Sequence, residues 1–263
     1  MKRLELITWP QAEAYFKEND TVIIPTGSIE SHGRHMPLGT DFLIPNKILE
    51  LCETRISALC APAMPYGCTE FLAPFPGTVN LGHDAYYAVM SSITESLRQH
   101  GAKHFIFLNG HGGNNPVLDR VGLDLYKKGC LCAEVNWWIL VWNLCGDWNG
   151  NTPWHGGHGA GEETAAVMAI DPSLVDMNEI DAPSVLTDLS DEIKGSGFRS
   201  VRFKGCDIPL SRYTSDVTDN GWVGDDDPHF ATKEWGEEML NAFADWFAEF
   251  TEAFGKAELP CAK

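Results

Sequence analysis

The chain has 263 residues, 44% of them hydrophobic, which is enough to bury a sizeable core and excludes an intrinsically disordered protein. Its 19 basic and 37 acidic side chains give a formal net charge of −18, so its field repels a phosphate backbone and argues against nucleic-acid binding. No apolar run reaches the roughly 18 residues that a membrane span requires, and the amino terminus has no signal-peptide pattern.

The eight cysteines form no CxxC pair and stand largely in apolar surroundings. In a chain of this length they indicate reduced, buried thiols rather than a disulfide framework. We therefore expect a cytoplasmic protein that binds neither membranes nor nucleic acids.

Short apolar runs alternate with helical patterns along the chain. Strands are predicted at residues 21–25, 59–64, 104–108 and 130–137. Helices are predicted at residues 42–56, 86–100, 116–128, 162–170 and 232–254. This alternation favours an α/β fold, a three-layer α/β/α sandwich with a mostly parallel central sheet. The turn-rich segment 177–227 is interpreted as an irregular excursion, so residues 1–263 are predicted to form one domain.

The first polar constellation follows the strand predicted at 21–25, at the edge where ligands of such sheets gather. Glu30 and His32 project to the same side of an extended backbone, and glycines allow the chain to bring Asp41 back to them. These ligand types suit zinc, manganese or iron(II) better than magnesium or calcium. Taken singly, Asp41 is also typical of a helix start, and the other two of an exposed loop. Together they favour a metal site.

The second constellation is the run Asn109-Gly110-His111-Gly112-Gly113-Asn114, which follows the clearest predicted strand. His111 stands where a strand end presents side chains to a crevice. A phosphate cradle is disfavoured, because the run lacks both the GxxxxGK[ST] lysine and the GxGxxG spacing. A tight turn with an incidental histidine remains an alternative.

The third constellation lies at the start of the helix predicted at 162–170. His155 and His158 stand among glycines, just before the adjacent carboxylates Glu162 and Glu163. Acids at a helix start are favoured by its dipole, so neither glutamate is informative alone. The histidines have no such structural reason, and one of them is a candidate proton shuttle because imidazole titrates near neutral pH.

These three segments resemble the creatininase family of amidohydrolases. The family's hallmark run has the form E-x-H-G-x-H-x-P-L-x-T-D, and residues 30–41 match every named position. Residues 109–114 match the form that most members carry, and residues 75–81 resemble the F-P-G-T stretch. Residues 224–236 resemble the closing G-D-P…A-T-x-x-x-G pattern, with extra acids inserted. The resemblance implies a parallel sheet between helices, in subunits usually assembled into hexamers.

The resemblance also implies a centre of one or two divalent ions, zinc, manganese or iron. Asp41 would bridge the ions, Glu30 and His111 would complete one position, and His32 would help to hold the other. A water or hydroxide shared by the ions would be the nucleophile. His158 would act in proton transfer. Trp154 would line the substrate pocket, to which we also assign His35 and Glu162.

Two departures from the family pattern concern the remaining ligand. Creatininase itself has a glutamate ligand two residues after the histidine of the second motif, where this chain has Gly113. Members that share the glycine use a glutamate of the third motif, which reads H-A-G-E-x-E-T. Here Glu163 keeps the spacing of the second glutamate, whereas Glu162 is displaced by one from the first. Glu163 is therefore predicted as the last ligand and as a catalytic residue, with Glu162 as the alternative, and creatinine is not the expected substrate.

The leading hypothesis is a metal-dependent hydrolase that cleaves the C–N bond of a small amide, including cyclic ones. One alternative is a ring-opening hydrolase for a cyclic sugar-like diketone, and another is a metal-binding protein without catalysis. Candidate aromatic residues for the cleft are Trp137, Trp138, Trp154, Tyr66 and Phe71, each of which is also consistent with core packing.

Overall fold

The computed structural model describes residues 1–145, 156–180, 185–224 and 226–262. At its centre is a five-stranded sheet in the order β1-β3-β2-β4-β5, with parallel pairing throughout. The strands are β1 (Lys2–Arg3), β2 (Thr21–Thr26), β3 (Leu59–Cys60), β4 (His104–Asn109) and β5 (Leu131–Asn136). Strands β2 and β4 are buried along their whole length, as continuous apolar runs in parallel sheets require.

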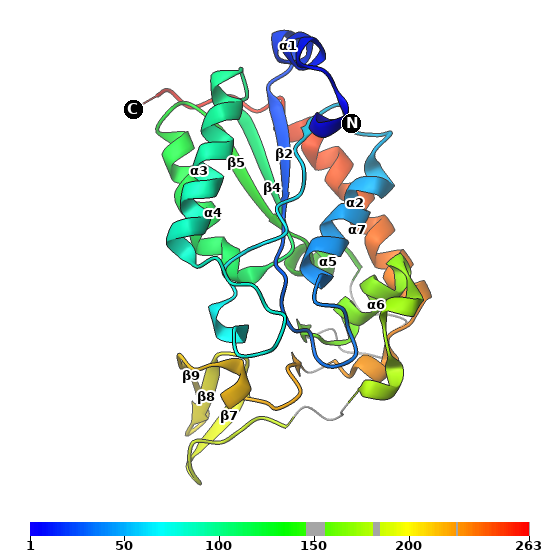
Figure 1. The fold of residues 1–263 in the computed structure, drawn as a ribbon, viewed down its shortest axis with the longest axis vertical. Coiled ribbons are helices and arrows are strands. Elements are labelled where there is room, and N and C mark those ends of the chain that lie inside the picture. Colours follow the sequence, from blue (N-terminus) through cyan, green and yellow to red (C-terminus); the bar gives the residue numbers. More distant parts are fainter. Residues whose placement is uncertain (146–155, 181–184, 225, 263) are drawn as a thin grey trace.

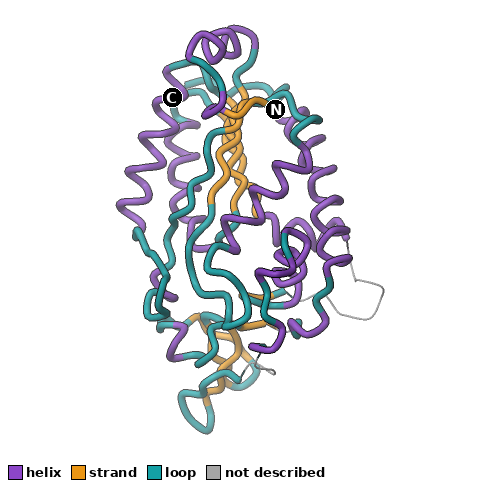
Figure 2. Tube along the Cα trace, turned by 45° about the vertical axis from the view of Figure 1, so that its right-hand side comes forward, coloured by secondary structure: helices purple, strands orange, loops and turns teal. Residues whose placement is uncertain are grey.

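Helices cover both faces of the sheet, which confirms the predicted three-layer sandwich (Figures 1 and 2). One face packs against α2 (Thr40–Cys52), α5 (Trp137–Cys145), α6 (Gly161–Ile170) and α7 (Lys233–Phe254). The other packs against α3 (His83–Gln99), α4 (Asn115–Tyr126) and Tyr15 of α1 (Trp9–Glu18). Side chains of β4 alternate between these layers, because Phe105 and Phe107 join one core and Ile106 and Leu108 the other.

The register of the parallel strands places their carboxyl ends level with one another. Thr26 lies opposite Asn109, and Asn109 lies opposite Asn136. The loops that carry the first two polar constellations therefore leave the sheet at the same edge. Among the described residues, no helix is both long and apolar enough to cross a bilayer.

Segment 177–227, expected to be irregular, instead contains a three-stranded antiparallel sheet. It consists of β7 (Ile193–Gly197), β8 (Ser200–Phe203) and β9 (Cys206–Pro209), joined by short turns. Figure 1 shows this sheet beyond the carboxyl ends of β2 and β4. A second small sheet pairs β6 (Gly157–His158) with β10 (Val223–Gly224). The prediction was wrong because strands of four or five residues with polar, half-exposed side chains carry no strong apolar alternation.

Two further differences concern the aromatic helix α5 and the strand β3. The strand predicted at 130–137 ends at Asn136, and the next nine residues form α5, which had no prediction. The helix is apolar on most sides, so its sequence has no clear helical stripe. The strand predicted at 59–64 is regular only over Leu59–Cys60, with an isolated bridge from Met64 to Thr26.

Two glycines let the strand-end loops approach the first turn of α2. A Cβ at Gly27 or Gly110 would overlap the carbonyl oxygen of Asp41, and at Gly110 it would also press on the ring of Pro45. Glycine is therefore required here by the close approach of one backbone to another. The packing fixes the start of α2 against the ends of β2 and β4.

Replacing Gly110 by alanine should lower the free energy of unfolding by about 3 kcal/mol. This value is in the upper part of the range for overpacked sites, because the backbone atoms that the new methyl group meets cannot move aside as a flexible side chain can. Urea denaturation measures the loss. Gly39→Ala is the matched control at the same helix start, because its added methyl would meet only ordinary contacts with Leu43 and Ile29. Equal stabilities of the two variants would contradict the packing argument.

Candidate metal centre

The loop after β2 buries two of the predicted ligands at the sheet edge. The Glu30 amide donates to the Leu38 carbonyl at 2.9 Å, which closes the loop between β2 and α2. Glu30 and His32 are 1% and 0% exposed. Asp41 lies in the first turn of α2, where the helix dipole favours a carboxylate, and accepts a hydrogen bond from the Ser28 hydroxyl at 2.8 Å. Charged side chains buried to this degree require partners.

Asp41 lies between two histidines. Its Oδ1 is 2.9 Å from Nε2 of His32, and its Oδ2 is 3.0 Å from Nδ1 of His111. A glutamate stands beside each imidazole: Glu163 Oε2 is 3.7 Å from the same nitrogen of His32, and Glu30 Oε1 is 3.2 Å from that of His111. The structure thus forms two three-residue groups that share Asp41, each with its donor atoms within 4.8 Å of one another.

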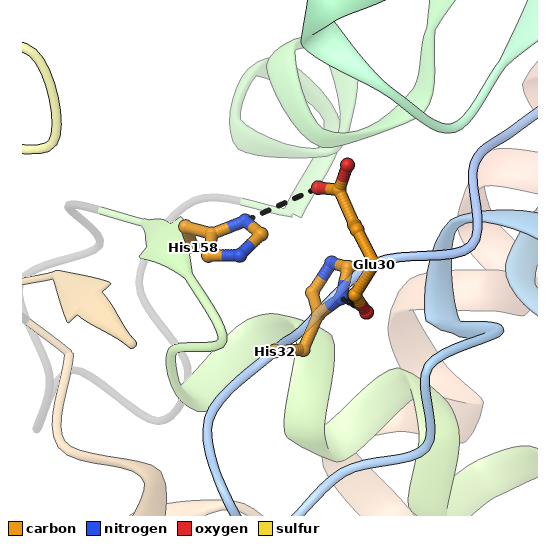
Figure 3. A group of neighbouring side chains, drawn as sticks. All are labelled: Glu30, His32 and His158. Atoms are coloured by element: carbon orange, nitrogen blue, oxygen red, sulfur yellow. Dashed lines mark hydrogen bonds and ion pairs between the residues drawn. The ribbon is translucent and has the colours of Figure 1, made fainter. Parts of the chain in front are cut away.

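His158 joins a third group of this kind, with Glu30 and His32. It lies on β6, and its Nδ1 is 3.8 Å from Oε1 of Glu30. Figure 3 shows the His158 ring facing the Glu30 carboxylate, with His32 beside them. The two imidazoles are 4.3 Å apart between ring centroids.

Each of these three histidines donates one ring N–H to a backbone carbonyl. His32 Nδ1 is 3.2 Å from the Glu30 oxygen, His111 Nε2 is 2.9 Å from the Cys68 oxygen, and His158 Nε2 is 2.6 Å from the Ser31 oxygen. Because a carbonyl only accepts, the opposite nitrogen of each ring faces the carboxylates, and it offers a lone pair to a metal ion whenever it carries no proton. Metal-ligating histidines are oriented in this way.

The asparagines of the second motif hold its loop in place. Asn109 accepts from the Thr26 hydroxyl at 2.9 Å and donates to the His111 carbonyl and to Asn136, each at 2.8 Å. Asn114 donates to the Gly27 carbonyl at 3.1 Å and accepts from the Cys68 amide at 3.0 Å. These bonds tie three strand ends to the turn that carries His111.

The electrostatics of the centre call for positive charge between its carboxylates. Burial alone would lower the pKa of His32, but Asp41 and Glu163 outweigh burial and raise that pKa to about 10. Burial likewise opposes a charged His111, yet Glu30 and Asp41 raise its pKa well above the usual value. Burial would raise the pKa of Asp41, whereas the two histidines hold it below its usual range. Protonated imidazoles thus supply the charge in the metal-free protein.

One buried oxygen supports the fit of a cation. Oε2 of Glu30 makes no hydrogen bond to any described residue, although the carboxylate is buried; burial would raise its pKa, but His111 outweighs burial and lowers it. An ionised carboxylate oxygen without a donor is costly to bury, and a metal ion would satisfy it. The donors are imidazole nitrogens and carboxylate oxygens, which suit zinc, manganese or iron(II).

The adjacent glutamates of α6 point to different partners. Glu163 accepts a hydrogen bond from the Gly159 amide at 2.7 Å and faces His32, and burial raises its pKa to about 7. Glu162 accepts from the Gly157 amide at 2.8 Å, and burial and Glu163 raise its pKa well above the usual value. Of the two, only Glu163 belongs to a ligand group among the described residues.

A cavity of about 850 Å³ opens at the centre and is lined by Glu30, Asp41, His111, His158 and Glu163. Of the predicted aromatic residues, Trp138 and Phe71 line it, whereas Trp137 is buried in the core and Tyr66 is exposed at the surface. His35 is buried and hydrogen-bonds Thr164 at 3.1 Å, away from the cavity lining. Trp154 and His155 lie outside the described residues.

The cavity-lining residues that sequence reasoning missed include Trp142, Phe198 and Arg199. Trp142 belongs to the unpredicted helix α5. Phe198 and Arg199 form the turn between β7 and β8, in the segment interpreted as irregular. No motif marks these positions, since only the folded arrangement brings them to the centre.

Known proteins resemble this chain over most of its length. Creatinine amidohydrolase of Pseudomonas putida is 29% identical over 192 residues, 66% of this chain and 74% of that protein. The mycofactocin precursor peptide peptidase of Mycobacterium ulcerans is 28% identical over 205 residues, 74% and 72% of the two chains. A 3-dehydro-scyllo-inosose hydrolase of Thermotoga maritima is 26% identical over 140 residues, 52% and 45%.

A solved structure described as a manganese creatininase superposes with a TM-score of 0.73 at 23% identity, over 96% of this chain and 98% of that one. The creatininase family, described as creatinine amidohydrolase, matches residues 5–251. This match confirms the resemblance predicted from the motifs and the expectation of a hydrolytic enzyme: the chain belongs to the creatininase family.

Proposed function

We propose that this protein hydrolyses the C–N bond of a small amide, linear or cyclic, at a centre of two divalent ions. One observation carries the proposal: the two oxygens of buried Asp41 each face a histidine nitrogen, and the opposite nitrogen of each ring donates to a backbone carbonyl. Zinc, manganese and iron(II) are the candidate ions.

The ligands divide into two sets that share Asp41. His32, Asp41 Oδ1 and Glu163 would hold one ion, and His111, Asp41 Oδ2 and Glu30 would hold the other. When bound, such ions polarise the scissile carbonyl and lower the pKa of water. Asp41 Oδ2 also accepts from Ser28, which keeps the shared carboxylate in one orientation.

We assign proton transfer to His158. Its Nε2–H is held by the Ser31 carbonyl, so Nδ1 faces the centre as the free acceptor. In the metal-free protein, burial and then the charge of His32 lower the pKa of His158 to about 4, so its ring is neutral at pH 7 and Nδ1 can accept a proton. Nδ1 would take a proton from the attacking water as its oxygen bonds to the carbonyl carbon. It would return that proton to the nitrogen as the C–N bond breaks.

The cavity supports a small substrate with a planar group. Trp138, Trp142 and Phe71 line it alongside the ligands and suit stacking on an amide or a ring. Trp154 and Glu162 remain predicted substrate-pocket residues, whereas His35 lies outside the cavity lining and is bonded to Thr164 instead. Glu162 would act indirectly: its carboxyl group accepts a hydrogen bond from the Gly157 amide, which positions the backbone next to His158.

Ring opening of a cyclic sugar-like diketone is the second candidate, favoured by the relationship to the inosose hydrolase of Thermotoga maritima. The same centre would polarise a ketone as it does an amide. Release of an amine or ammonia identifies amide hydrolysis. Formation of a carboxylate without a nitrogen product identifies ring opening at carbon.

We further propose a cytoplasmic homo-oligomer that acts on a small molecule. All eight cysteines are free, as the cytoplasm maintains them. Ile139, Trp142 and Leu144 of α5 are 36–49% exposed, an apolar surface of the kind that subunit contacts cover. A hexamer is the form expected from the family resemblance.

Metal analysis of variants tests the ligand sets. Wild-type protein should bind up to about two divalent ions per chain, and E163Q should bind the ion of the His32 position at least about 100-fold more weakly. E162Q is the matched control one residue away, and should keep the metal content of the wild type. Metal loss in E162Q but not in E163Q would reverse the assignment. D41N should weaken both positions, because Asp41 faces both histidines.

Metal binding should release protons, because the pKa of His32 is raised to about 10 and that of His111 is also raised. Calorimetric titration with Zn²⁺ in buffers of different ionisation enthalpy at pH 7 should give about two protons per chain. The metal-free protein should also lose stability as pH rises from about 7 towards 10, where these imidazolium ions deprotonate, whereas the loaded protein should not. A binding enthalpy that is the same in every buffer would contradict the assignment of protonated His32 and His111.

Hydrolysis itself is tested with metal-loaded protein on a panel of linear and cyclic amides, with the amine or ammonia product measured. H158Q should lower kcat about 100-fold or more while keeping its metal, since general acid–base catalysis is worth that much. H100Q, at the exposed end of α3, is the control histidine and should retain full activity. Full activity in H158Q would remove His158 from the mechanism, and no amide turned over would remove the proposed function.

A further inference from the structure

The antiparallel sheet β7-β8-β9 brings a cation to the cavity that the proposed mechanism does not use. Gly197 pairs with Ser200, so Phe198 and Arg199 form a two-residue turn, and both line the cavity. The Leu210 amide donates to the Arg199 carbonyl at 3.0 Å, which ties the turn to the segment after β9. The side chains at its tip are therefore carried by a hydrogen-bonded hairpin.

The turn lies directly against the candidate centre. The ring of Phe198 packs on His158 with 4.9 Å between centroids, and His158 Nδ1 is 3.8 Å from the Glu30 carboxylate. Arg199 is the next residue along the chain. A group held by Arg199 and a scissile bond at the centre would therefore fit within one small substrate.

The Arg199 side chain is held against an aromatic ring and makes no hydrogen bond to any residue that the structure describes. Its guanidinium carbon lies 3.9 Å from the centroid of the Phe71 ring, and Phe71 lines the same cavity. This cation–π contact with the ring face leaves the N–H groups available as donors. On the same hairpin Arg202 makes a two-bond pair with Asp207, at 2.8 Å for each bond, whereas Arg199 makes no ion pair with any described residue.

Arg199 is a positive charge in a cavity that is otherwise lined by several acidic side chains. Among the described cavity-lining residues it is the only lysine or arginine, and the acids Glu30, Asp41, Glu70 and Glu163 share that lining. The whole chain carries a net charge of −18, a field that repels anions. A neutral substrate would gain little from a stacked cation here. A carboxylate placed beside the Phe71 wall of the cavity would gain a counter-charge from it.

We propose that Arg199 binds a carboxylate of the substrate, so that the substrate class is small amides that carry a free carboxylate. The planar guanidinium matches a carboxylate through two parallel N–H···O bonds. This inference rests on the proposed amide hydrolysis for its reaction, but its binding step is measurable without turnover.

The test compares matched ligands that differ only in the carboxylate. Zn²⁺-loaded protein is titrated with 5-oxoproline and 5-oxoprolinamide, and with N-acetylphenylalanine and its amide, and the dissociation constants are measured. Wild-type protein should bind each acid at least about tenfold more tightly than its amide, as expected of a hydrogen bond to a charged group. R199M keeps an apolar stem on Phe71 but removes the charge, and should abolish that preference.

Two further variants separate charge, geometry and metal binding. R199K should retain only part of the preference, because lysine has the charge without the planar fork. R202A is the hairpin control and should leave every ratio unchanged. A carboxylate bound by the metal ions instead would keep its preference in R199M, and that result overturns the proposal. The proposal is also overturned if wild-type protein binds neither acid, or if it binds the amides more tightly than the acids.

Assays of turnover separate the role of Arg199 from the proposed amide hydrolysis. Hydrolysis of amides with no acid preference would leave the proposed function in place and remove the role of Arg199. Acid-selective binding lost in R199M, without hydrolysis of any panel member, would support the carboxylate site and count against amide hydrolysis. With turnover, R199M should raise KM for the acids at least about tenfold and leave kcat nearly unchanged, as loss of a binding contact requires.

Discussion

The arrangement of the whole site follows from one buried carboxylate held between two imidazoles. Asp41 is 3% exposed, and charge at that depth is tolerated only with compensation on both oxygens. His32 and His111 provide it, and they come from loops that follow different strands. The parallel sheet makes this meeting possible, because its register ends β2 and β4 at the same level.

Much of this architecture was predictable from the sequence because its signals are local. Strand β4 and helix α7 have strong periodicity, and they appear close to the predicted bounds. The ligand candidates Glu30, His32, Asp41 and His111 lie between glycines at strand ends, where physical reasoning and family resemblance agree. The structure brings all four together.

What escaped prediction lies in segments whose structure depends on tertiary contacts. Helix α5 is apolar on most sides, so its period is hidden. The hairpin β7–β8 has short, partly exposed strands, and neither Phe198 nor Arg199 belongs to a motif. The sequence alone could not decide whether Glu162 or Glu163 faces the centre. Adjacent residues of a helix point about 100° apart, so the answer depends on how the helix is oriented in the fold. Only the fold shows Glu163 facing His32 while Glu162 faces the Gly157 amide.

The atoms that orient the three histidines are main-chain oxygens, of Glu30, Ser31 and Cys68. Every residue type carries such an oxygen, so substitutions at Ser31 or Cys68 that preserve the backbone leave the imidazoles aimed as before. The aim of the three rings therefore depends on the path of the backbone at these positions rather than on their side chains. The hairpin and the aromatic walls of the cavity supply none of these three oxygens, so their side chains shape the cavity without taking part in these contacts.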